Sequence, residues 1–85
     1  MDETNFNKEI SMQRYADLND DSGVSSYDIG DSDIKVWFNR DTASYIYSYS
    51  SAGQYHLEYM KKLALSGKGL NTYIDRNVKR EYEES

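Results

Sequence analysis

The chain has neither cysteine nor proline, and it contains a single histidine. Without cysteine it forms no disulfide and offers no thiolate ligand, so we expect packing alone to stabilise it. No apolar run approaches the ~20 residues that a helix needs to cross a bilayer. The first residues also lack the basic and then apolar order of a signal peptide. These absences predict a soluble cytoplasmic protein that is not associated with a membrane.

The length of 85 residues suits one domain with a single core and leaves no room for a second. We expect a domain at residues 24–82, preceded by a polar segment at 1–23 and followed by a frayed tail at 83–85. The polar segment is expected to be weakly structured or to hold one short element. That element is either a weak helix at residues 8–17 or an edge strand at 10–15.

Charge is distributed unevenly along the chain. The net charge is −5, but residues 1–42 carry −6 and residues 43–85 carry +1. Residues 61–80 have a local charge of +5 because they contain one acid and six cations: Lys61, Lys62, Lys68, Arg76, Lys79 and Arg80. The acidic total disfavours non-specific binding of nucleic acid, whereas this basic segment would attract phosphate groups. Partial neutralisation of one half by the other is the simpler expectation.

The most regular alternation lies in the centre of the chain and predicts a β-strand. Its large apolar side chains recur at every second position: Ile34, Val36 and Phe38. Because strand side chains alternate between faces, these three share one face and Trp37 points to the other. A shorter strand at residues 24–29 should precede it and end before the turn that begins at Gly30.

Three tyrosines share one face of the next predicted strand: Tyr45, Tyr47 and Tyr49. Residues 39–42 are expected to form the hairpin turn that precedes this strand. Exposed tyrosine rings on a sheet would stack on bases or contact a protein. Packing of the rings across strands within the sheet is the alternative. The sequence thus predicts three antiparallel strands.

Two helices are predicted after the sheet. Ser51 and Gln54 fit a capping box, so the first helix should begin near Ala52. Its apolar stripe is wide enough to cover a small sheet: Ala52, Tyr55, Tyr59, Met60, Leu63 and Ala64. Gly67 should end this helix in the left-handed conformation, and Gly69 should let the chain reverse. The second helix has apolar residues four apart: Leu70, Ile74, Val78 and Tyr82. The predicted fold class is therefore α+β, a three-stranded antiparallel sheet packed against two C-terminal helices.

The order of these motifs resembles the KTSC domain, a small module at the C-terminus of some lysyl-tRNA synthetases that also occurs as a stand-alone bacterial or phage protein. The resemblance covers about residues 24–82. Its most specific features are the Tyr45-x-Tyr47 pair and a Ser-Gly-Lys-Gly-Leu-Asn-x-x-Ile turn, in which Asn71 and Ile74 occupy matching positions. Many members carry Val-Pro before the helix, where this chain has serines. The family has no established activity, and RNA binding is suggested for it.

The sequence contains no convincing catalytic or metal-binding pattern. His56 has no cysteine or acidic cluster near it in the sequence, and Ser66 lies outside a Gly-x-Ser-x-Gly motif. The Gly-Lys-Gly stretch at residues 67–69 is too short for a phosphate loop. We therefore expect a non-enzymatic protein that needs no cofactor.

Residues 17–28 match a calcium loop only in part. Asp17, Asn19 and Asp21 occupy ligand positions one, three and five of such a loop. Ser22 replaces the glycine of the sharp turn, and Asp28 is too short to act as the usual bidentate glutamate. A solvated turn is the expected structure, and metal binding is the minor alternative.

Two binding roles of different classes remain. The first is a protein-interaction domain, encoded by a phage or mobile element, that binds a host protein through the acidic residues 17–33 or a tyrosine-rich surface. The alternative is binding of RNA or other nucleic acid through exposed tyrosines and residues 61–80. The chain is expected to be a monomer or a weak homo-oligomer. The candidate binding residues are Trp37, Tyr45, Tyr47, Tyr49, Lys61, Lys62, Lys68, Asn71, Arg76, Lys79 and Arg80.

Overall fold

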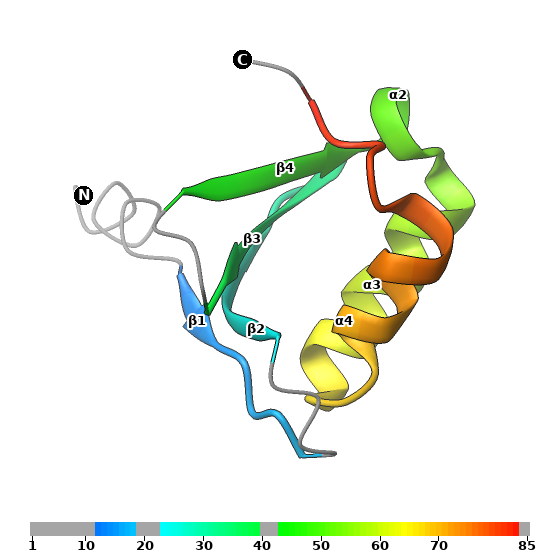
Figure 1. Ribbon diagram of the computed structural model, residues 1–85. Coiled ribbons are helices and arrows are strands. Elements are labelled where there is room, and N and C mark those ends of the chain that lie inside the picture. Colours follow the sequence, from blue (N-terminus) through cyan, green and yellow to red (C-terminus); the bar gives the residue numbers. More distant parts are fainter. Residues whose placement is uncertain (1–11, 19–22, 40–42, 84–85) are drawn as a thin grey trace, which may run out of the picture.

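The structure, a computed structural model, describes residues 12–18, 23–39 and 43–83. Within them, a four-stranded antiparallel sheet of order β1-β2-β3-β4 is covered on one face by helices (Figure 1). The strands are β1 (Gln13–Arg14), β2 (Val24–Ile29), β3 (Asp33–Phe38) and β4 (Ser44–Ser48). The helices are α2 (Tyr49–Ala52), α3 (Gln54–Ser66), α4 (Leu70–Tyr73) and the π-helical η1 (Ile74–Val78). The predicted α+β class is confirmed, with one strand more than expected.

Several predictions lie partly outside the described residues, among them the polar segment at 1–23, its alternative helix at 8–17 or strand at 10–15, and the tail at 83–85. Residues 40–42 of the expected hairpin turn lie there, as do residues 19–22 of the partial calcium loop. In the described part of the chain, no helix is both long enough and apolar enough to span a membrane.

The pairing of the three long strands fixes which side chains face the helices. Val36 lies opposite Tyr27 of β2 and opposite Tyr45 of β4. Ile34 and Val36 are fully buried, whereas Lys35 and Trp37 lie on the other face of β3. The predicted alternation along this strand is therefore confirmed.

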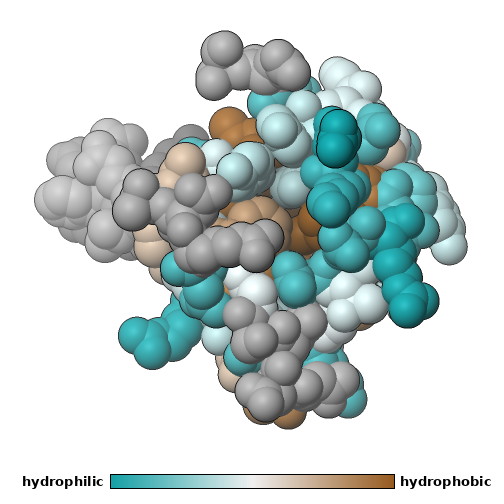
Figure 2. Space-filling model, viewed as in Figure 1, coloured by the Kyte–Doolittle hydropathy of each residue, from teal (hydrophilic) through white to brown (hydrophobic). Residues whose placement is uncertain are grey.

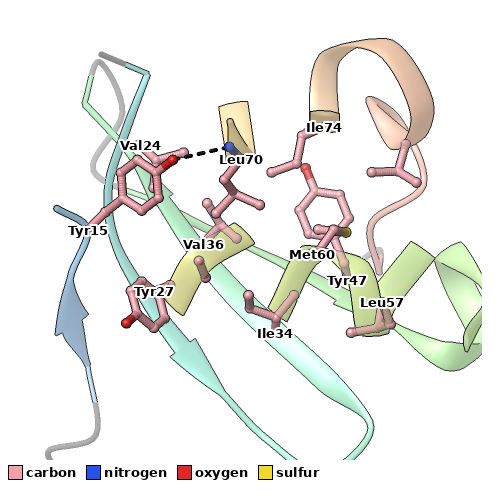
Figure 3. Close-up of a cluster of buried hydrophobic side chains, with 12 residues drawn as sticks. Tyr15, Val24, Tyr27, Ile34, Val36, Tyr47, Leu57, Met60, Leu70 and Ile74 are labelled. Carbon is pink, nitrogen blue, oxygen red and sulfur yellow. Dashed lines mark hydrogen bonds between the residues drawn. The ribbon is translucent and has the colours of Figure 1, made fainter. Parts of the chain in front are cut away.

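Among residues 12–18 of the polar segment, the structure shows an edge strand, β1. Gln13 and Arg14 pair with Tyr27 and Ser26 of β2. The next residue, Tyr15, is buried, and its hydroxyl accepts a hydrogen bond from the Leu70 amide at 3.1 Å (Figure 3). This contact connects the edge of the sheet to the first residue of α4, so the core includes a side chain from before residue 24.

The first helix begins earlier than predicted, because Ser48 is its N-cap. Ser48 Oγ accepts from the Ser51 amide at 3.1 Å, and Ser51 Oγ accepts from the Ser48 amide at 3.0 Å. The capping box predicted at Ser51 and Gln54 is wrong by three residues, since two serines at the same spacing form one upstream. Gly53, at φ 95°, then separates α2 from α3. Tyr49 consequently begins α2 and does not extend β4.

The helix α3 packs on the sheet through a face rotated from the predicted one. Leu57, Met60 and Ala64 are buried, whereas Tyr55 and Tyr59 are 78% and 42% exposed. Both sets have helical spacing. Met60 and Ala64 belong to the predicted stripe, and the structure buries Leu57 beside them, which leaves the phenolic hydroxyls of Tyr55 and Tyr59 hydrated. The prediction that Tyr55 and Tyr59 face the core is therefore wrong.

The core lies between the sheet and the helices (Figure 3). Val36 of β3 and Met60 of α3 are both fully buried in it, as expected if the helix covers the strand pair. At the end of α3, Gly67 adopts φ 78°, and its amide donates to the carbonyls of Leu63 and Ala64. This is the left-handed cap that the sequence predicts. Gly69 also has positive φ, at 83°.

The segment after η1 returns to the sheet at β4. Tyr82 packs edge-to-face on Tyr45 and Tyr47, with ring centroids 4.9 and 6.1 Å away. The Glu83 amide then donates to the Ile46 carbonyl at 2.6 Å. Tyr82 thus covers the tyrosine rings of β4, and residue 83 is bonded to the outer edge of this strand.

Candidate binding surface

The tyrosines expected as an exposed row on β4 do not form one. Tyr47 is 1% exposed, and burial raises the pKa of its phenol. Tyr45 is half-buried against the core, with Phe38 at 5.5 Å between ring centroids. The strand register places both rings on the face that the helices cover. Tyr45 and Tyr47 therefore build the core, as the alternative of packing within the sheet predicted, and they are not the exposed rings that the binding hypotheses needed.

Tyr49 belongs to a hydrogen-bonded network at the start of the helical layer. Its hydroxyl donates to the Glu58 carboxylate at 2.6 Å. Lys61 Nζ donates to the same carboxylate oxygen at 3.2 Å and to the Asp31 carbonyl at 2.8 Å, and it lies 5.7 Å from the Tyr49 ring centroid. We call these four residues the Tyr49 network. It connects α2, α3 and the turn between β2 and β3.

The electrostatics of the Tyr49 network follow from its hydrogen bonds. Donation by Tyr49 and by Lys61 stabilises the ionised carboxylate, so the pKa of Glu58 lies below its ordinary value. The hydrogen bond to Glu58 raises the pKa of Tyr49, because loss of the phenolic proton would remove it. Glu58 is therefore a carboxylate whose charge is already matched within the molecule.

Trp37 lies on the face of the sheet opposite the helices, as predicted. It is half-buried, and Ser26 and Ser44 flank it on the neighbouring strands. Lys35 Nζ lies 5.9 Å from the Trp37 ring centroid, within the range of a cation–π contact. This face is separate from the basic helical layer, so Trp37 does not join the cations in one site.

The other predicted residues divide by what they contact. Asn71 packs against Gly23, where an added Cβ would overlap its amide, so it has a structural contact. Lys79 pairs with Asp75 at 3.4 Å. Three further cations are exposed: Lys68, Arg76 and Arg80. In the view of Figure 2, hydrophilic side chains gather over α4 and η1.

A shallow groove lies on the outer face of α3, opposite the face that packs on the sheet. Its volume is about 460 Å³, and it is lined by Gln54, Tyr55, Glu58, Tyr59 and Lys62. We call this the α3 groove. The five residues recur at spacings of one to four, so successive turns of one helix present them on one side. Lys62 is the one member of the α3 groove among the residues predicted from the sequence.

A cluster of rings supports one side of the α3 groove. Tyr59 packs on Tyr73 of α4 with centroids 4.9 Å apart, and His56 packs on the same ring at 5.6 Å. His56 Nδ1 and the Tyr73 hydroxyl share a hydrogen bond. Burial raises the pKa of Tyr73. Because Tyr59 is held by α4, the groove is preorganised on this side.

Two further large apolar residues are exposed near the C-terminal end of α3. Leu65 is 70% exposed and lies three residues after Lys62. Leu18 is 68% exposed, and its amide donates to the Gly67 carbonyl at 2.6 Å. Large apolar residues exposed along one helix mark a candidate interaction surface.

The sequence contains a signal for the α3 groove, although the predicted stripe included Tyr55 and Tyr59. Met60 and Ala64 of that stripe also align with Leu57, and these three side chains are purely apolar. The polarity of the tyrosine hydroxyls therefore favours Leu57 as the buried neighbour and places the tyrosines outside. The contact of Tyr73 with His56 depends on how α4 folds back, and no local pattern indicates it.

Among the described residues, no group of three or more His, Cys, Asp or Glu side chains could hold a metal ion. Comparison with protein-family models, with curated proteins and with solved structures finds no match to the chain.

Proposed function

We propose that the chain is a non-enzymatic protein-interaction module that binds its partner through the α3 groove. The observation that carries this proposal is the exposure of Tyr55 and Tyr59 on a helix whose opposite face is fully packed. Tyrosine offers a large apolar area and one polar group, and it loses little side-chain freedom on binding. Residues of this type are enriched among those that dominate binding energy.

The same proposal includes the KTSC-like assignment and a phage or mobile-element origin with a host protein as partner. Residues that carry the resemblance have defined structural roles, which supports it. Gly67 and Gly69 adopt positive φ, and Ile74 is buried in the core. Asn71 packs against Gly23 at the start of β2. The resembling turn is thus the segment that reverses the chain between α3 and α4.

The test is capture of a partner from nuclease-treated host lysate by the immobilised chain. The double variant Tyr55→Ala/Tyr59→Ala should lose the captured protein, because it removes both rings of the α3 groove. Met12→Ala is the matched control, since Met12 is 52% exposed and lies next to β1. Retention of the captured protein by the double variant would assign binding to another surface and reject this proposal.

Nucleic acid is the second candidate, and one observation favours it. Four exposed cations form no ion pair with any described residue: Lys62, Lys68, Arg76 and Arg80. Together with exposed rings they would supply phosphate contacts and stacking. Burial of Tyr45 and Tyr47 removes the stacking surface expected on the sheet. A fluorescence anisotropy titration with single-stranded RNA at low and high salt tests this candidate, and the absence of salt-dependent binding rejects it.

A further inference from the structure

The charges of the α3 groove are arranged in an unusual way. Glu58 and Lys62 are four residues apart on one helix, the spacing at which an acid and a following base commonly pair. In this protein the Glu58 carboxylate is instead bonded to Tyr49 and Lys61. Lys62 is exposed and forms no ion pair within residues 12–18, 23–39 and 43–83. The free charge of the groove is therefore positive.

The surroundings of Lys62 favour an anionic ligand. Tyr55 and Tyr59 line the same groove, so an acidic group that approaches Lys62 also meets apolar rings. Partial removal of water by these rings strengthens a charge-assisted hydrogen bond between an ammonium and a carboxylate. Leu65, further along the helix, extends the apolar surface on which a neighbouring side chain of the ligand would rest.

We infer that the α3 groove takes a peptide segment in which an aspartate or glutamate stands beside large apolar side chains, and that Tyr49 is the positioning residue that keeps Lys62 available. This inference rests on the proposed function. Tyr49 acts through Glu58: while its hydroxyl holds that carboxylate, Glu58 does not compete with the ligand for Lys62. The acidic residue of the ligand pairs with Lys62, and its apolar neighbours cover Tyr55 and Tyr59.

The probe is a library of random peptides displayed on phage and selected on the immobilised chain. Peptides enriched on the unchanged protein should carry an acidic residue next to apolar ones. A labelled copy of an enriched peptide is then titrated by fluorescence anisotropy. Lys62→Glu should weaken its binding at least about tenfold, because like charges then face each other. Met12→Ala should leave its affinity unchanged.

The role of Tyr49 has its own signature. Tyr49→Phe removes the hydroxyl and keeps the ring, so only Lys61 still holds Glu58 and the carboxylate can turn toward Lys62 more readily. An exposed pair at this spacing is weak, so peptide affinity should fall about twofold. Tyr49→Phe/Glu58→Gln should restore the affinity, because glutamine does not compete as a charge. A purely structural effect of Tyr49 would not be rescued in this way.

The outcomes separate the two proposals. Enriched peptides that need Tyr55 and Tyr59 but show no acidic preference would overturn the inference and leave the proposed function standing. Tyr49→Phe that has no effect on affinity, or that is not rescued, would overturn the positioning role. Enriched peptides that bind Tyr55→Ala/Tyr59→Ala equally well, or no enrichment at all, would overturn the proposed function and the inference together.

Discussion

At the scale of single residues, one hydroxyl decides which charges the surface of α3 presents. Tyr49 lies on α2, and its hydroxyl donates to the carboxylate of Glu58, nine residues further along the chain. The sequence pattern predicts Tyr49 as a binding residue on a strand. Its position after the Ser48 cap turns it toward α3, where it acts on a neighbouring carboxylate.

Replacement of Tyr49 by phenylalanine should raise the pKa of Glu58 toward its ordinary value of 4.5. In the folded protein the pKa of Glu58 is lower than in the unfolded chain. The network therefore stabilises the fold at pH values above the ordinary pKa, and this contribution is lost as the pH falls through the pKa of the folded protein. Carboxyl carbon shifts measured by NMR across acidic pH would follow the change. Tyr55→Phe, the control, should leave the Glu58 curve where it is. Coincident curves for Tyr49→Phe and the unchanged protein would contradict the hydrogen bond.

Two glycines with positive φ allow a matched comparison. Gly67 and Gly69 have similar φ values of 78° and 83°, so alanine at either position incurs a left-handed strain of about 1–2 kcal/mol. A Cβ on Gly67 would also lie 2.6 Å from Ala16 Cβ, whereas on Gly69 its nearest neighbour is 3.8 Å away. Gly67→Ala should therefore lower the free energy of unfolding by more than Gly69→Ala, as measured in urea. Equal losses of unfolding free energy for the two variants would mean that the segment at Ala16 moves away from the new Cβ without destabilising the fold.

At the scale of elements, α3 shows what periodicity can and cannot decide. The existence of the helix, its end at Gly67 and its place over the sheet follow from the sequence alone. Its rotation does not, because Leu57 on one side and the tyrosines on the other both extend the stripe that contains Met60 and Ala64. Packing on Ile34 and Val36 selects the aliphatic stripe, and that tertiary choice creates the tyrosine surface. The predicted start of the helical layer was wrong for a related reason. Ser48 with Ser51 and Ser51 with Gln54 both have the spacing of a capping box, and the structure uses the first pair.

The rotation of α3 predicts a large loss of stability on substitution of Leu57 and a small one on substitution of Tyr55. Leu57 is fully buried, so Leu57→Ala should reduce the free energy of unfolding by about 2–5 kcal/mol. Tyr55 is 78% exposed, so Tyr55→Ala should change it by no more than about 0.5 kcal/mol. Urea denaturation of both variants provides the measurement. A large loss for Tyr55→Ala would place that ring in the core and reverse the assignment of faces.

At the scale of the whole molecule, the strand pattern and the fold class could be predicted, and the candidate surface largely could not. Strand alternation and helix punctuation are local properties, which is why β2, β3 and the Gly67 cap agree with expectation. Burial of Tyr47 and pairing of Lys61 depend on what folds against them. The six cations of residues 61–80 illustrate the limit, because Lys61 and Lys79 are paired while Lys62 forms no ion pair with the residues that the structure describes.

The edge of β4 gives a prediction at this scale. The Glu83 amide is bonded to the Ile46 carbonyl, and Glu83→Pro would remove that donor. The carbonyl would then be open to another chain, and unpaired strand edges promote association. We expect multi-angle light scattering to show a concentration-dependent rise in mean mass for Glu83→Pro. Glu83→Ala, which keeps the amide, should remain at the mass of the unchanged protein.

The same contact has a practical meaning for how the protein is handled. Because the last described residues fold back onto a strand, a tag or fluorescent fusion appended there would pull on Tyr82 and Glu83 together, whereas one attached at the opposite terminus would not act on them directly. Assays of partner capture should therefore immobilise the chain by its beginning. A difference in oligomer content between the two tagged forms would show whether the contact between Glu83 and Ile46 keeps the edge of β4 covered.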